Sequence, residues 1–321
     1  MPQFYRKPGM ANRRTCAVIG GGTMGADIAL TLARAGCTTH LVETFEEVRK
    51  TLAGRLCAGL AALGCPGRLD RLCVHASLDA VPWPGIDLVI EAVPERLDLK
   101  RGLFAEVLPR LRDDALLTSN SSSFPISAIA EGLPSAHRFF GLHYFMPAHL
   151  VPLVEVVCGP ASDPALAEDL AGFMRATGKV PVIVRKDLPG FLANRLQHAL
   201  AREALALVEA GVATPADVDA AVRFGFGFRF LAAGPLLQRD HAGLDVHAAA
   251  AATMYPTLAA GARPSRVLTD RVAAGRLGMK AGGGFYDWTP QAIARERERY
   301  EALLRAGLAL IAPELPPVEG G

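Results

Sequence analysis

Short apolar runs rich in β-branched residues alternate with amphipathic stretches over the first part of the chain, from Thr15 to about Lys186. Such alternation predicts a mostly parallel sheet with helices on both faces. We therefore expect an α/β fold of the doubly wound type. The clearest predicted strands are Cys16–Ile19, Thr38–Val42, Leu88–Glu91, Leu116–Thr118, Arg138–His143, Val151–Val157 and Pro181–Val184.

The pattern changes after Lys186, where the run Asp-Leu-Pro-Gly interrupts it and strand signals almost vanish. Phe191–Gly211 is predicted as one long helix, and Thr214 followed by Pro215 is typical of the N-cap and first position of another. The second part of the chain is therefore expected to be all-helical.

Three segments are expected from these changes: a mobile N-terminal arm at residues 1–13, a sheet domain at 14–186 and an all-helical domain at 187–321. Helices that do not pack on a sheet must bury their apolar faces against another surface, and the apolar segment Leu192–Val208 is suited to a subunit interface. We therefore expect a homodimer formed through the helical domain.

The first predicted strand runs directly into the glycine-rich turn Gly20-Gly21-Gly22-Thr23-Met24-Gly25 and then into an Ala/Leu-rich helix. Gly20 suits a tight turn, Gly22 suits a close approach of a pyrophosphate to the backbone, and Gly25 suits close packing of helix on strand. The N-terminal end of the following helix favours phosphate groups. This order predicts a Rossmann-type dinucleotide site; the alternative is a structural turn with no ligand.

The second predicted strand ends in Glu43, which can accept hydrogen bonds from both hydroxyls of an adenosine ribose. Its charge would repel a 2′-phosphate. NAD is therefore the expected cofactor, rather than NADP.

Composition narrows the classes of partner. The chain has 321 residues, half of them hydrophobic, and its 34 Lys and Arg against 32 Asp and Glu leave a formal charge of +2. Without a basic block, neither nucleic acid nor an anionic membrane is an expected partner. The six cysteines are scattered and form no C-x-x-C pair, which favours reduced thiols in the cytoplasm over disulfides or a metal site. We expect no secretory signal and no membrane span.

Two groups of residues could carry chemistry. Ser119–Ser123 follows a predicted strand end, where ligands of open α/β sheets collect; alternatively it caps a helix at Pro125–Glu131. His143 and Glu155 lie on consecutive predicted strands, so antiparallel pairing could bring an imidazole base beside a carboxylate. The alternatives are an ordinary core or loop histidine and a strand-edge charge.

Taken in order, these and further motifs resemble the L-3-hydroxyacyl-CoA dehydrogenase family, from Arg14 to about Trp288. The motifs that carry the resemblance are Gly20–Gly25, Glu91–Glu95, Ser119–Ser123, Gly141–Phe145, Val154–Val156, Pro189–Arg195, Gly278–Lys280 and Gly284–Tyr286. The resemblance implies an NAD-dependent enzyme of fatty acid metabolism. Such an enzyme reversibly oxidises the 3-hydroxyl of an L-3-hydroxyacyl compound to the 3-oxo product.

The same resemblance assigns site residues by position. The family's catalytic dyad falls on His143 and Glu155, its oxygen-binding serine on Ser122, and its cleft asparagine on Asn194. Glu95 and Lys100 match residues that touch the nicotinamide-side ribose; without the family, they are an ordinary surface pair. The implied NAD-binding residues together are Gly20, Gly22, Thr23, Met24, Gly25, Glu43, Ala92, Val93, Glu95, Lys100 and Asn120.

Two departures from the family concern the substrate. Met146 stands where members commonly carry an asparagine, and a thioether cannot donate a hydrogen bond. The segment Thr51–Gly67 replaces a long Lys-rich arm and has no lysine, which leaves Arg55, Arg68 and Arg71 as candidates to bind CoA phosphates.

A third feature, around Arg229, resembles a branch of the family that includes gulonate and carnitine dehydrogenases and the lens λ-crystallin. In that branch an arginine at this distance from the cleft asparagine serves the active site. Arg229 could pair with a substrate carboxylate, or it could only cap a helix end or cover neighbouring phenylalanines. The alternatives are thus a CoA thioester dehydrogenase, a dehydrogenase of a free 3-hydroxy acid, and a non-catalytic structural protein.

Overall fold

The computed structural model describes residues 14–318, so the arm expected at residues 1–13 lies outside the described residues. The described chain forms two compact units. Unit 1 comprises residues 14–194 together with residues 313–318, and unit 2 comprises Arg195–Ala312. The last segment belongs to unit 1 because Val318 forms an antiparallel bridge with Thr177 and packs against the core.

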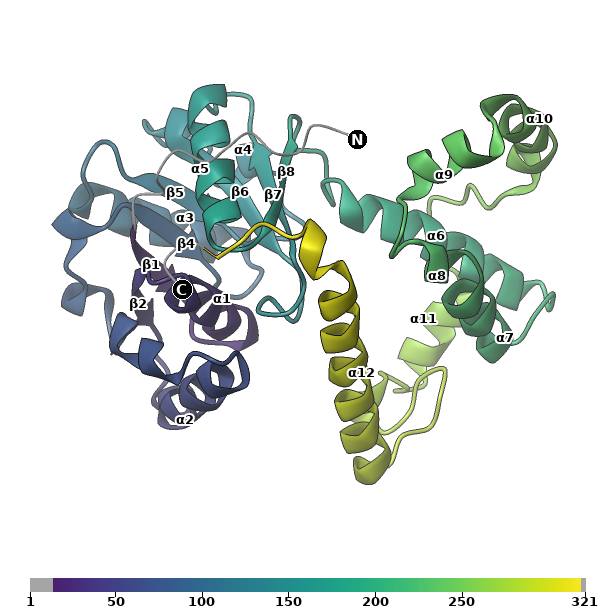
Figure 1. The fold of residues 1–321 in the computed structure, drawn as a ribbon, viewed down its shortest axis with the longest axis horizontal. Coiled ribbons are helices and arrows are strands. Elements are labelled where there is room, and N and C mark those ends of the chain that lie inside the picture. Colours follow the sequence, from purple (N-terminus) through teal and green to yellow (C-terminus); the bar gives the residue numbers. More distant parts are fainter. Residues whose placement is uncertain (1–13, 319–321) are drawn as a thin grey trace. The chain divides into compact units, whose positions relative to one another are not determined.

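Unit 1 is built on one sheet of eight strands in the order β3-β2-β1-β4-β5-β6-β7-β8 (Figure 1). All neighbouring strands are parallel except β6 and β7, which confirms the predicted doubly wound, mostly parallel fold. The order reverses between β1 and β4, and in such sheets this switch point opens the crevice for a ligand. The strands are β1 (Thr15–Ile19), β2 (Thr38–Val42), β3 (Leu72–His75), β4 (Leu88–Glu91), β5 (Leu116–Ser119), β6 (Phe139–Tyr144), β7 (Leu153–Cys158) and β8 (Val180–Val184).

One strand, β3, is absent from the sequence prediction. It has only four residues, it pairs on one side with β2 at the sheet edge, and none of its residues is buried. An edge strand of this length need not be apolar, so its sequence carries little pattern.

Helices cover both faces of the sheet. Those of unit 1 are α1 (Thr23–Arg34), α2 (Glu46–Ala62), α3 (Leu97–Val107), α4 (Ile126–Ile129) and α5 (Pro164–Ala176), with 3₁₀ turns η1 (Pro66–Arg71), η2 (Leu78–Ala80), η3 (Trp83–Gly85), η4 (Leu108–Arg110) and η5 (Ala136–Arg138). Along β1, Cys16 and Val18 pack in one core with α1, α2 and α5, whereas Ala17 and Ile19 pack in a second core with α3 and α4. Strand residues alternate between faces, so each buried face receives its own set.

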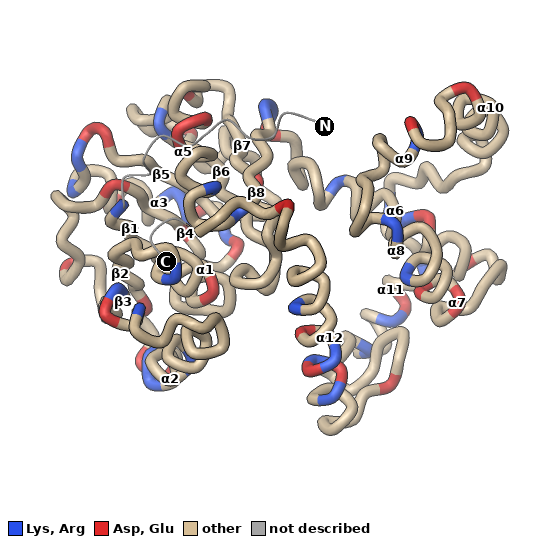
Figure 2. Tube along the Cα trace, in the orientation of Figure 1, with Lys and Arg blue, Asp and Glu red and all other residues tan. Residues whose placement is uncertain are grey.

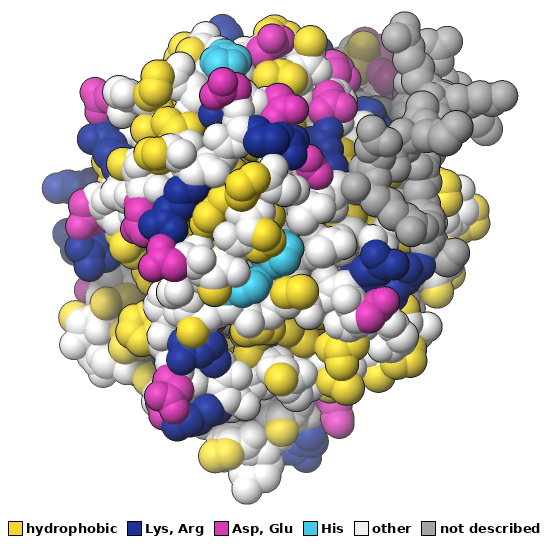
Figure 3. Space-filling view, turned by 90° about the vertical axis from the view of Figure 1, so that its left-hand side faces the viewer, with side chains coloured by type: hydrophobic (Ala, Val, Ile, Leu, Met, Phe, Trp, Pro, Cys, Tyr) yellow, Lys and Arg dark blue, Asp and Glu magenta, His cyan; other side chains and the backbone are white. Residues whose placement is uncertain are grey.

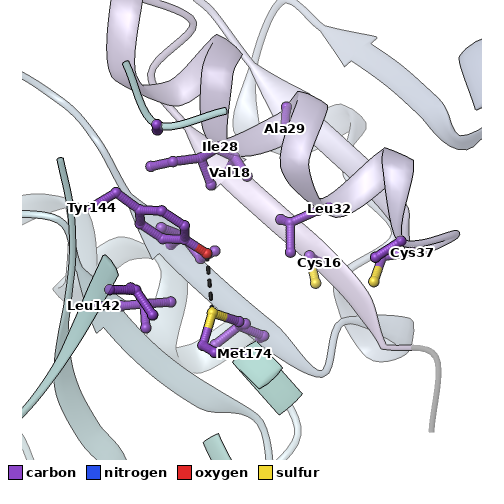
Figure 4. Close-up of a cluster of buried hydrophobic side chains, with 14 of the residues drawn as sticks. Cys16, Val18, Ile28, Ala29, Leu32, Cys37, Leu142, Tyr144 and Met174 are labelled. Atoms are coloured by element: carbon purple, nitrogen blue, oxygen red, sulfur yellow. Dashed lines mark hydrogen bonds between the residues drawn. The ribbon is translucent and has the colours of Figure 1, made fainter. Parts of the chain in front are cut away.

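The first core includes one polar contact (Figure 4). The hydroxyl of Tyr144 donates a hydrogen bond of 3.1 Å to the sulfur of Met174 on α5. Burial raises the pKa of Tyr144 well above its ordinary value. This contact holds the side chain of Tyr144 in place at the end of β6, one residue after His143.

Unit 2 is helical, as predicted. Its elements are α6 (Ala193–Glu209, which begins in unit 1), α7 (Pro215–Ala220), the π-helical segment η6 (Ala221–Phe226), α8 (Gly227–Arg229), α9 (Pro235–Ala242), α10 (Leu244–Met254), η7 (Tyr255–Thr257), α11 (Arg266–Ala273), η8 (Met279–Ala281), α12 (Pro290–Ile311) and η9 (Ala312–Glu314). Thr214 is the N-cap of α7 and Pro215 its first residue, as the sequence indicated, and Asp217 completes a reciprocal capping box with Thr214. The helix expected from Phe191 begins at Ala193 because Phe191 has a φ of 49°.

Burial differs sharply in unit 2. Ala233 is the single buried hydrophobic residue within Arg195–Ala312, whereas large side chains such as Phe224, Phe228, Leu236 and Tyr255 are exposed.

Charged side chains of both signs are interspersed along the chain, as on α2 and α12 (Figure 2). The face of unit 1 in Figure 3 likewise mixes both signs, so this face offers no continuous basic surface. Within residues 14–318, none of the helices has the length and apolar character needed to cross a bilayer. The same residues contain no cluster of three metal-binding side chains.

Candidate active site

The glycine elbow between β1 and α1 has the backbone that the sequence predicts. Gly20 has a φ of 108°, and a Cβ there would lie 2.6 Å from the carbonyl oxygen of Ala92 on the neighbouring β4 side. A Cβ at Gly25 would lie 1.7 Å from the carbonyl oxygen of Gly20. Neither position admits another residue, so both glycines are needed to fold the elbow.

The third glycine has no such packing constraint. A Cβ at Gly22 would meet nothing within 4 Å, and Gly22 and Thr23 are both exposed. No side chain caps the N-terminus of α1, and its first turn, which includes Met24, has no acidic residue. The open backbone at this helix end fits a pyrophosphate.

Glu43 is buried at the end of β2 and binds the elbow itself. Its carboxylate accepts hydrogen bonds from the backbone N–H of Gly21 at 2.9 Å and of Phe45 at 2.8 Å. A carboxylate has about four acceptor sites, so two contacts leave capacity for ribose hydroxyls. The sequence indicated the ribose contact but not this structural one.

The segment after β4 is organised by a buried lysine. Lys100, whose side chain is 1% exposed, lies 2.7 Å from Glu91 Oε1 and 3.1 Å from Glu95 Oε2. Glu91 also accepts hydrogen bonds from the backbone N–H of Val93, beside Ala92, and from the hydroxyl of Ser119. Lys100 is therefore not a surface residue, although Glu95 is exposed; both belong to a charged network that holds two strand ends together.

The serine-rich segment after β5 contacts the same network. The hydroxyl of Ser121 donates to Glu95 at 2.5 Å, and the hydroxyl of Ser123 donates to it at 2.6 Å. Burial alone would raise the pKa of Glu95, but these bonds and Lys100 lower it to about 2. Glu95 is thus ionised at neutral pH.

The alternative role of these serines, capping α4, is wrong. The N-cap residue of α4 is Pro125, and no side chain caps that helix. Ser122 lies exposed between the two serines that bind Glu95. Asn120 Oδ1 accepts a hydrogen bond of 2.9 Å from the backbone N–H of Tyr144, which ties this segment to β6.

His143 and Glu155 face one another across the antiparallel pair β6 and β7, where their Cα atoms are register partners. His143 Nδ1 lies 2.7 Å from Glu155 Oε2, and both side chains are buried. A carboxylate at Nδ1 places the proton on that nitrogen and leaves the lone pair on Nε2. The pair can therefore accept or donate a proton through Nε2.

The second oxygen of Glu155 binds the start of α6. Oε1 accepts hydrogen bonds from the backbone N–H of Leu192 at 3.1 Å and of Ala193 at 2.7 Å. These groups have no partner within the helix, so the carboxylate acts as its cap. Asn194, half-buried, is the next residue. This contact could not be predicted from the sequence, because it joins residues 37 and 38 positions apart.

Apolar side chains surround the imidazole. The ring of Phe145 lies 4.5 Å and that of Phe191 5.6 Å from the ring of His143, measured between centroids. Met146, the departure from the family pattern, is 66% exposed.

The arginines expected to serve a substrate differ in their contacts. Arg55 donates to Asp27 at 2.6 Å and to the carbonyl of Thr23 at 2.9 Å, while Arg71 lies 3.8 Å from Asp70. Arg229, in unit 2, is exposed, and its guanidinium forms no hydrogen bond or ring contact with the described residues.

Comparison with known proteins gives two matching family models. Residues 15–188 match the NAD binding domain of 3-hydroxyacyl-CoA dehydrogenase, and residues 190–288 match the C-terminal domain of the same enzymes.

Individual relatives extend over most of the chain. The 5-formyl-3-hydroxy-2-methylpyridine 4-carboxylate 5-dehydrogenase of Mesorhizobium japonicum is 32% identical over 89% of this chain and 95% of its own length. The 3-hydroxyadipyl-CoA dehydrogenase of Escherichia coli is 38% identical over 87% of this chain, which spans 60% of that enzyme. The human mitochondrial hydroxyacyl-coenzyme A dehydrogenase is 34% identical over 84% of this chain and 90% of its own length.

Among solved structures, a 5-formyl-3-hydroxy-2-methylpyridine 4-carboxylic acid 5-dehydrogenase aligns with a TM-score of 0.87 at 30% identity, over 93% of this chain and 99% of that one. That protein is described as NAD⁺-dependent. The resemblance found in the sequence is confirmed: the chain belongs to the 3-hydroxyacyl-CoA dehydrogenase family, as an NAD-dependent oxidoreductase.

Proposed function

We propose that the chain reversibly oxidises the hydroxyl of a 3-hydroxyacyl compound, with His143 as the acid and base. The observation that carries the proposal is the 2.7 Å contact between His143 Nδ1 and Glu155 Oε2 in a buried setting. Nε2 accepts the hydroxyl proton in oxidation and returns it in reduction, while Glu155 stabilises the imidazolium. Bound NAD supplies the hydride acceptor.

Ser122 and Asn194 are proposed to polarise the reacting oxygen. On the cofactor, the elbow from Gly20 to Gly25 holds the pyrophosphate and Glu43 the adenosine ribose. Ala92, Val93, Glu95 and Asn120 line the nicotinamide side, and Lys100 acts there through its contact with Glu95.

For the substrate, we favour a free acid over a CoA thioester. Arg55 is engaged by Asp27, and Lys50, the lysine nearest to the segment without lysines, is paired with Glu46 and Glu47. Arg55 and Lys50 thus already have carboxylate partners, which weakens the case that α2 binds CoA phosphates. Arg229, with its exposed guanidinium, is suited to pair with a substrate carboxylate in a planar, bidentate contact.

The relatives support both substrate classes. The Mesorhizobium enzyme is named for a free pyridine carboxylate, whereas the Escherichia coli enzyme is named for a CoA thioester. An aldehyde reacts as its hydrate, which presents the same H–C–O–H group as an alcohol. A CoA thioester is thus the second candidate.

A panel of substrates tests the proposal. NADH formation at 340 nm would be followed with 3-hydroxybutyrate, gulonate, carnitine, the pyridine aldehyde and 3-hydroxybutyryl-CoA. We expect turnover of at least one free acid and a kcat/KM for the CoA thioester at least about tenfold lower, a difference of about 1.4 kcal/mol in transition-state binding. A preference for the thioester would reverse the assignment, and no turnover of any member would favour the non-catalytic alternative.

We also propose a homodimer formed through unit 2, because its large apolar side chains are exposed within the described chain. A cytoplasmic location is part of the proposal, on the ground that all six cysteines are free. Light scattering coupled to gel filtration tests the dimer; a monomeric mass at micromolar concentration contradicts it.

A further inference from the structure

Asp27 is a buried carboxylate that the proposed chemistry does not use. It lies on α1, two residues after the last glycine of the elbow, and is 4% exposed. A buried ionised carboxylate is costly unless its oxygens meet opposite charges or donors. Its contacts therefore indicate what it does.

The two oxygens of Asp27 reach two different parts of unit 1. Oδ1 lies 2.6 Å from a guanidinium nitrogen of Arg55 on α2, and Oδ2 lies 3.1 Å from Nδ1 of His149. Burial by itself raises the pKa of Asp27, but His149 and Arg55 lower it below its ordinary value. Asp27 thus lies between the guanidinium of Arg55 and the imidazole of His149.

Arg55 connects Asp27 to the glycine elbow. Its guanidinium also donates to the carbonyl oxygens of Thr23 at 2.9 Å and Gly22 at 3.4 Å. These two residues form the helix end that fits a pyrophosphate. A ligand that fixes this end also fixes the acceptors of Arg55.

His149 connects Asp27 to the turn that joins β6 and β7, residues 145–152, which we call the base turn because it follows His143. Two main-chain hydrogen bonds close it, from the N–H groups of Leu150 and Val151 to the carbonyl of Pro147. Two side chains from outside the turn also contact its carbonyl groups. Lys179 Nζ donates to the carbonyls of Ala148 and Val151, and Thr31 Oγ1 lies 3.4 Å from the carbonyl of Ala148.

We propose that Asp27 is a positioning residue that couples NAD binding at the glycine elbow to the stability of the base turn. Opening the turn must separate His149 from Asp27. When NAD orders the first turn of α1, Asp27 and Arg55 lose freedom to follow that opening, so the turn opens less often. The coupling is reciprocal: an ordered base turn favours NAD binding by the same factor.

The charges around Asp27 allow this coupling to be isolated. Arg55 faces Asp27 from α2 and His149 faces it from the base turn, while Lys179 on the β8 side is bound to carbonyls. Asp27→Asn keeps the size of the side chain, removes its charge and replaces one acceptor oxygen by an NH2 donor. Asp114→Asn is the matched control, because Asp114 pairs with Arg112 on the exposed surface of the same unit.

Hydrogen exchange with saturating NAD⁺ tests the proposal without knowledge of the substrate. In the unaltered protein we expect NAD⁺ to slow exchange both at the elbow and, by about fivefold or more, in the base turn. In Asp27→Asn we expect the slowing at the elbow to persist and that in the base turn to disappear. Asp114→Asn should behave like the unaltered protein.

Two results would overturn the proposal: no NAD-dependent slowing in the base turn of the unaltered protein, or equal slowing in Asp27→Asn. If Asp27→Asn does not fold, His149→Leu replaces it, since leucine has no polar atom and so removes the same contact from the turn side. The same loss of coupling is expected there, and its retention contradicts the proposal. The failure of a substrate panel would leave these readouts unaffected, so the two hypotheses fail separately.

Discussion

The two units of this chain use amphipathic helices in opposite ways. In unit 1, helices lie on a sheet, and residues such as Ile28 and Phe104 are fully buried against it. In unit 2, Leu236 is 82% and Phe224 71% exposed, and Ala233 is the one buried hydrophobic residue. A sheet offers its helices a continuous apolar face on which to pack. Helices without a sheet must pack against one another or against another apolar surface. Unit 1 therefore has a core of its own within the described residues, whereas the apolar side chains of unit 2 are left exposed.

The strongest test of this contrast is His143→Ala, which places the chemistry in unit 1. Removing a general base typically costs 10²–10⁴-fold, so we expect kcat/KM to fall by about that factor. Affinity for NADH, measured by fluorescence titration, should change little, because His143 does not lie at the elbow. His137→Ala is the control, since His137 is exposed. Activity equal to that of the control would mean that another group is the base.

A pair of leucines compares the units directly. Leu56 on α2 is 1% exposed, whereas Leu236 on α9 is 82% exposed. Leu56→Ala should cost about 2–5 kcal/mol of stability, because it opens a cavity in the core of unit 1. Leu236→Ala should change the stability of a monomer by less than about 0.5 kcal/mol.

Urea unfolding of both variants at a protein concentration below dimer formation measures these differences. Leu236→Ala should instead weaken self-association in sedimentation experiments. A large loss of monomer stability in Leu236→Ala would show that unit 2 has a core of its own, and the contrast would fail.

Much of the fold of unit 1 could be predicted because its buried strands appear in the sequence as short apolar runs between glycines. Ile19 followed by Gly20 marks a strand end and a turn in the same place, and a Cβ at Gly20 has no room. Strand β3 could not be predicted, since an edge strand with no buried residue has no such run. The network of Lys100 could likewise not be predicted. Lysine side chains are mostly exposed unless they are paired, and the sequence does not show which residues pair with this one.

The candidate site shows the same limit. Spacing could suggest that His143 and Glu155 meet across a hairpin, because antiparallel pairing is local in sequence. It could not suggest that Glu155 binds Ala193, or that Asp27 meets His149, because these contacts join distant segments. Contacts within a helix or a hairpin can be predicted from the spacing of residues in the sequence. Hydrogen bonds between distant segments cannot.

Arg229→Met tests whether unit 2 contributes to the site. Loss of a bidentate contact with a substrate carboxylate should lower kcat/KM by about 10–100-fold. The effect should be confined to substrates that carry a free carboxylate. Arg297→Met, also an exposed arginine of unit 2, serves as control. An unchanged kcat/KM in Arg229→Met would leave the catalytic role to unit 1 alone.

The smallest expected effect concerns the pH dependence of stability in unit 1. Burial lowers the pKa of Lys179 from 10.5 to about 7. Between pH 7 and 10.5 the unfolded chain therefore holds this proton more tightly than the folded one, so stability from Lys179 rises with pH across that window. Below pH 7 the full penalty of charging the buried amine is present.

Lys179→Met removes this dependence, together with the bonds to Ala148 and Val151. The difference in Tm between the unaltered protein and the variant should therefore grow from pH 7 to pH 9.5, in favour of the unaltered protein. A difference that stays constant across these values would show that the amine is not desolvated as the structure indicates.

The two contacts of the Glu155 carboxylate affect how inactive relatives could be recognised. Because one oxygen holds the imidazole and the other holds the first turn of α6, a descendant that no longer turned over substrate would still need this acid to keep its helix in place. Survival of the acid is thus poor proof of an active enzyme. If His143 and Ser122 have the proposed roles, loss of the imidazole or of the exposed hydroxyl at Ser122 would be the more direct sign that catalysis has been lost.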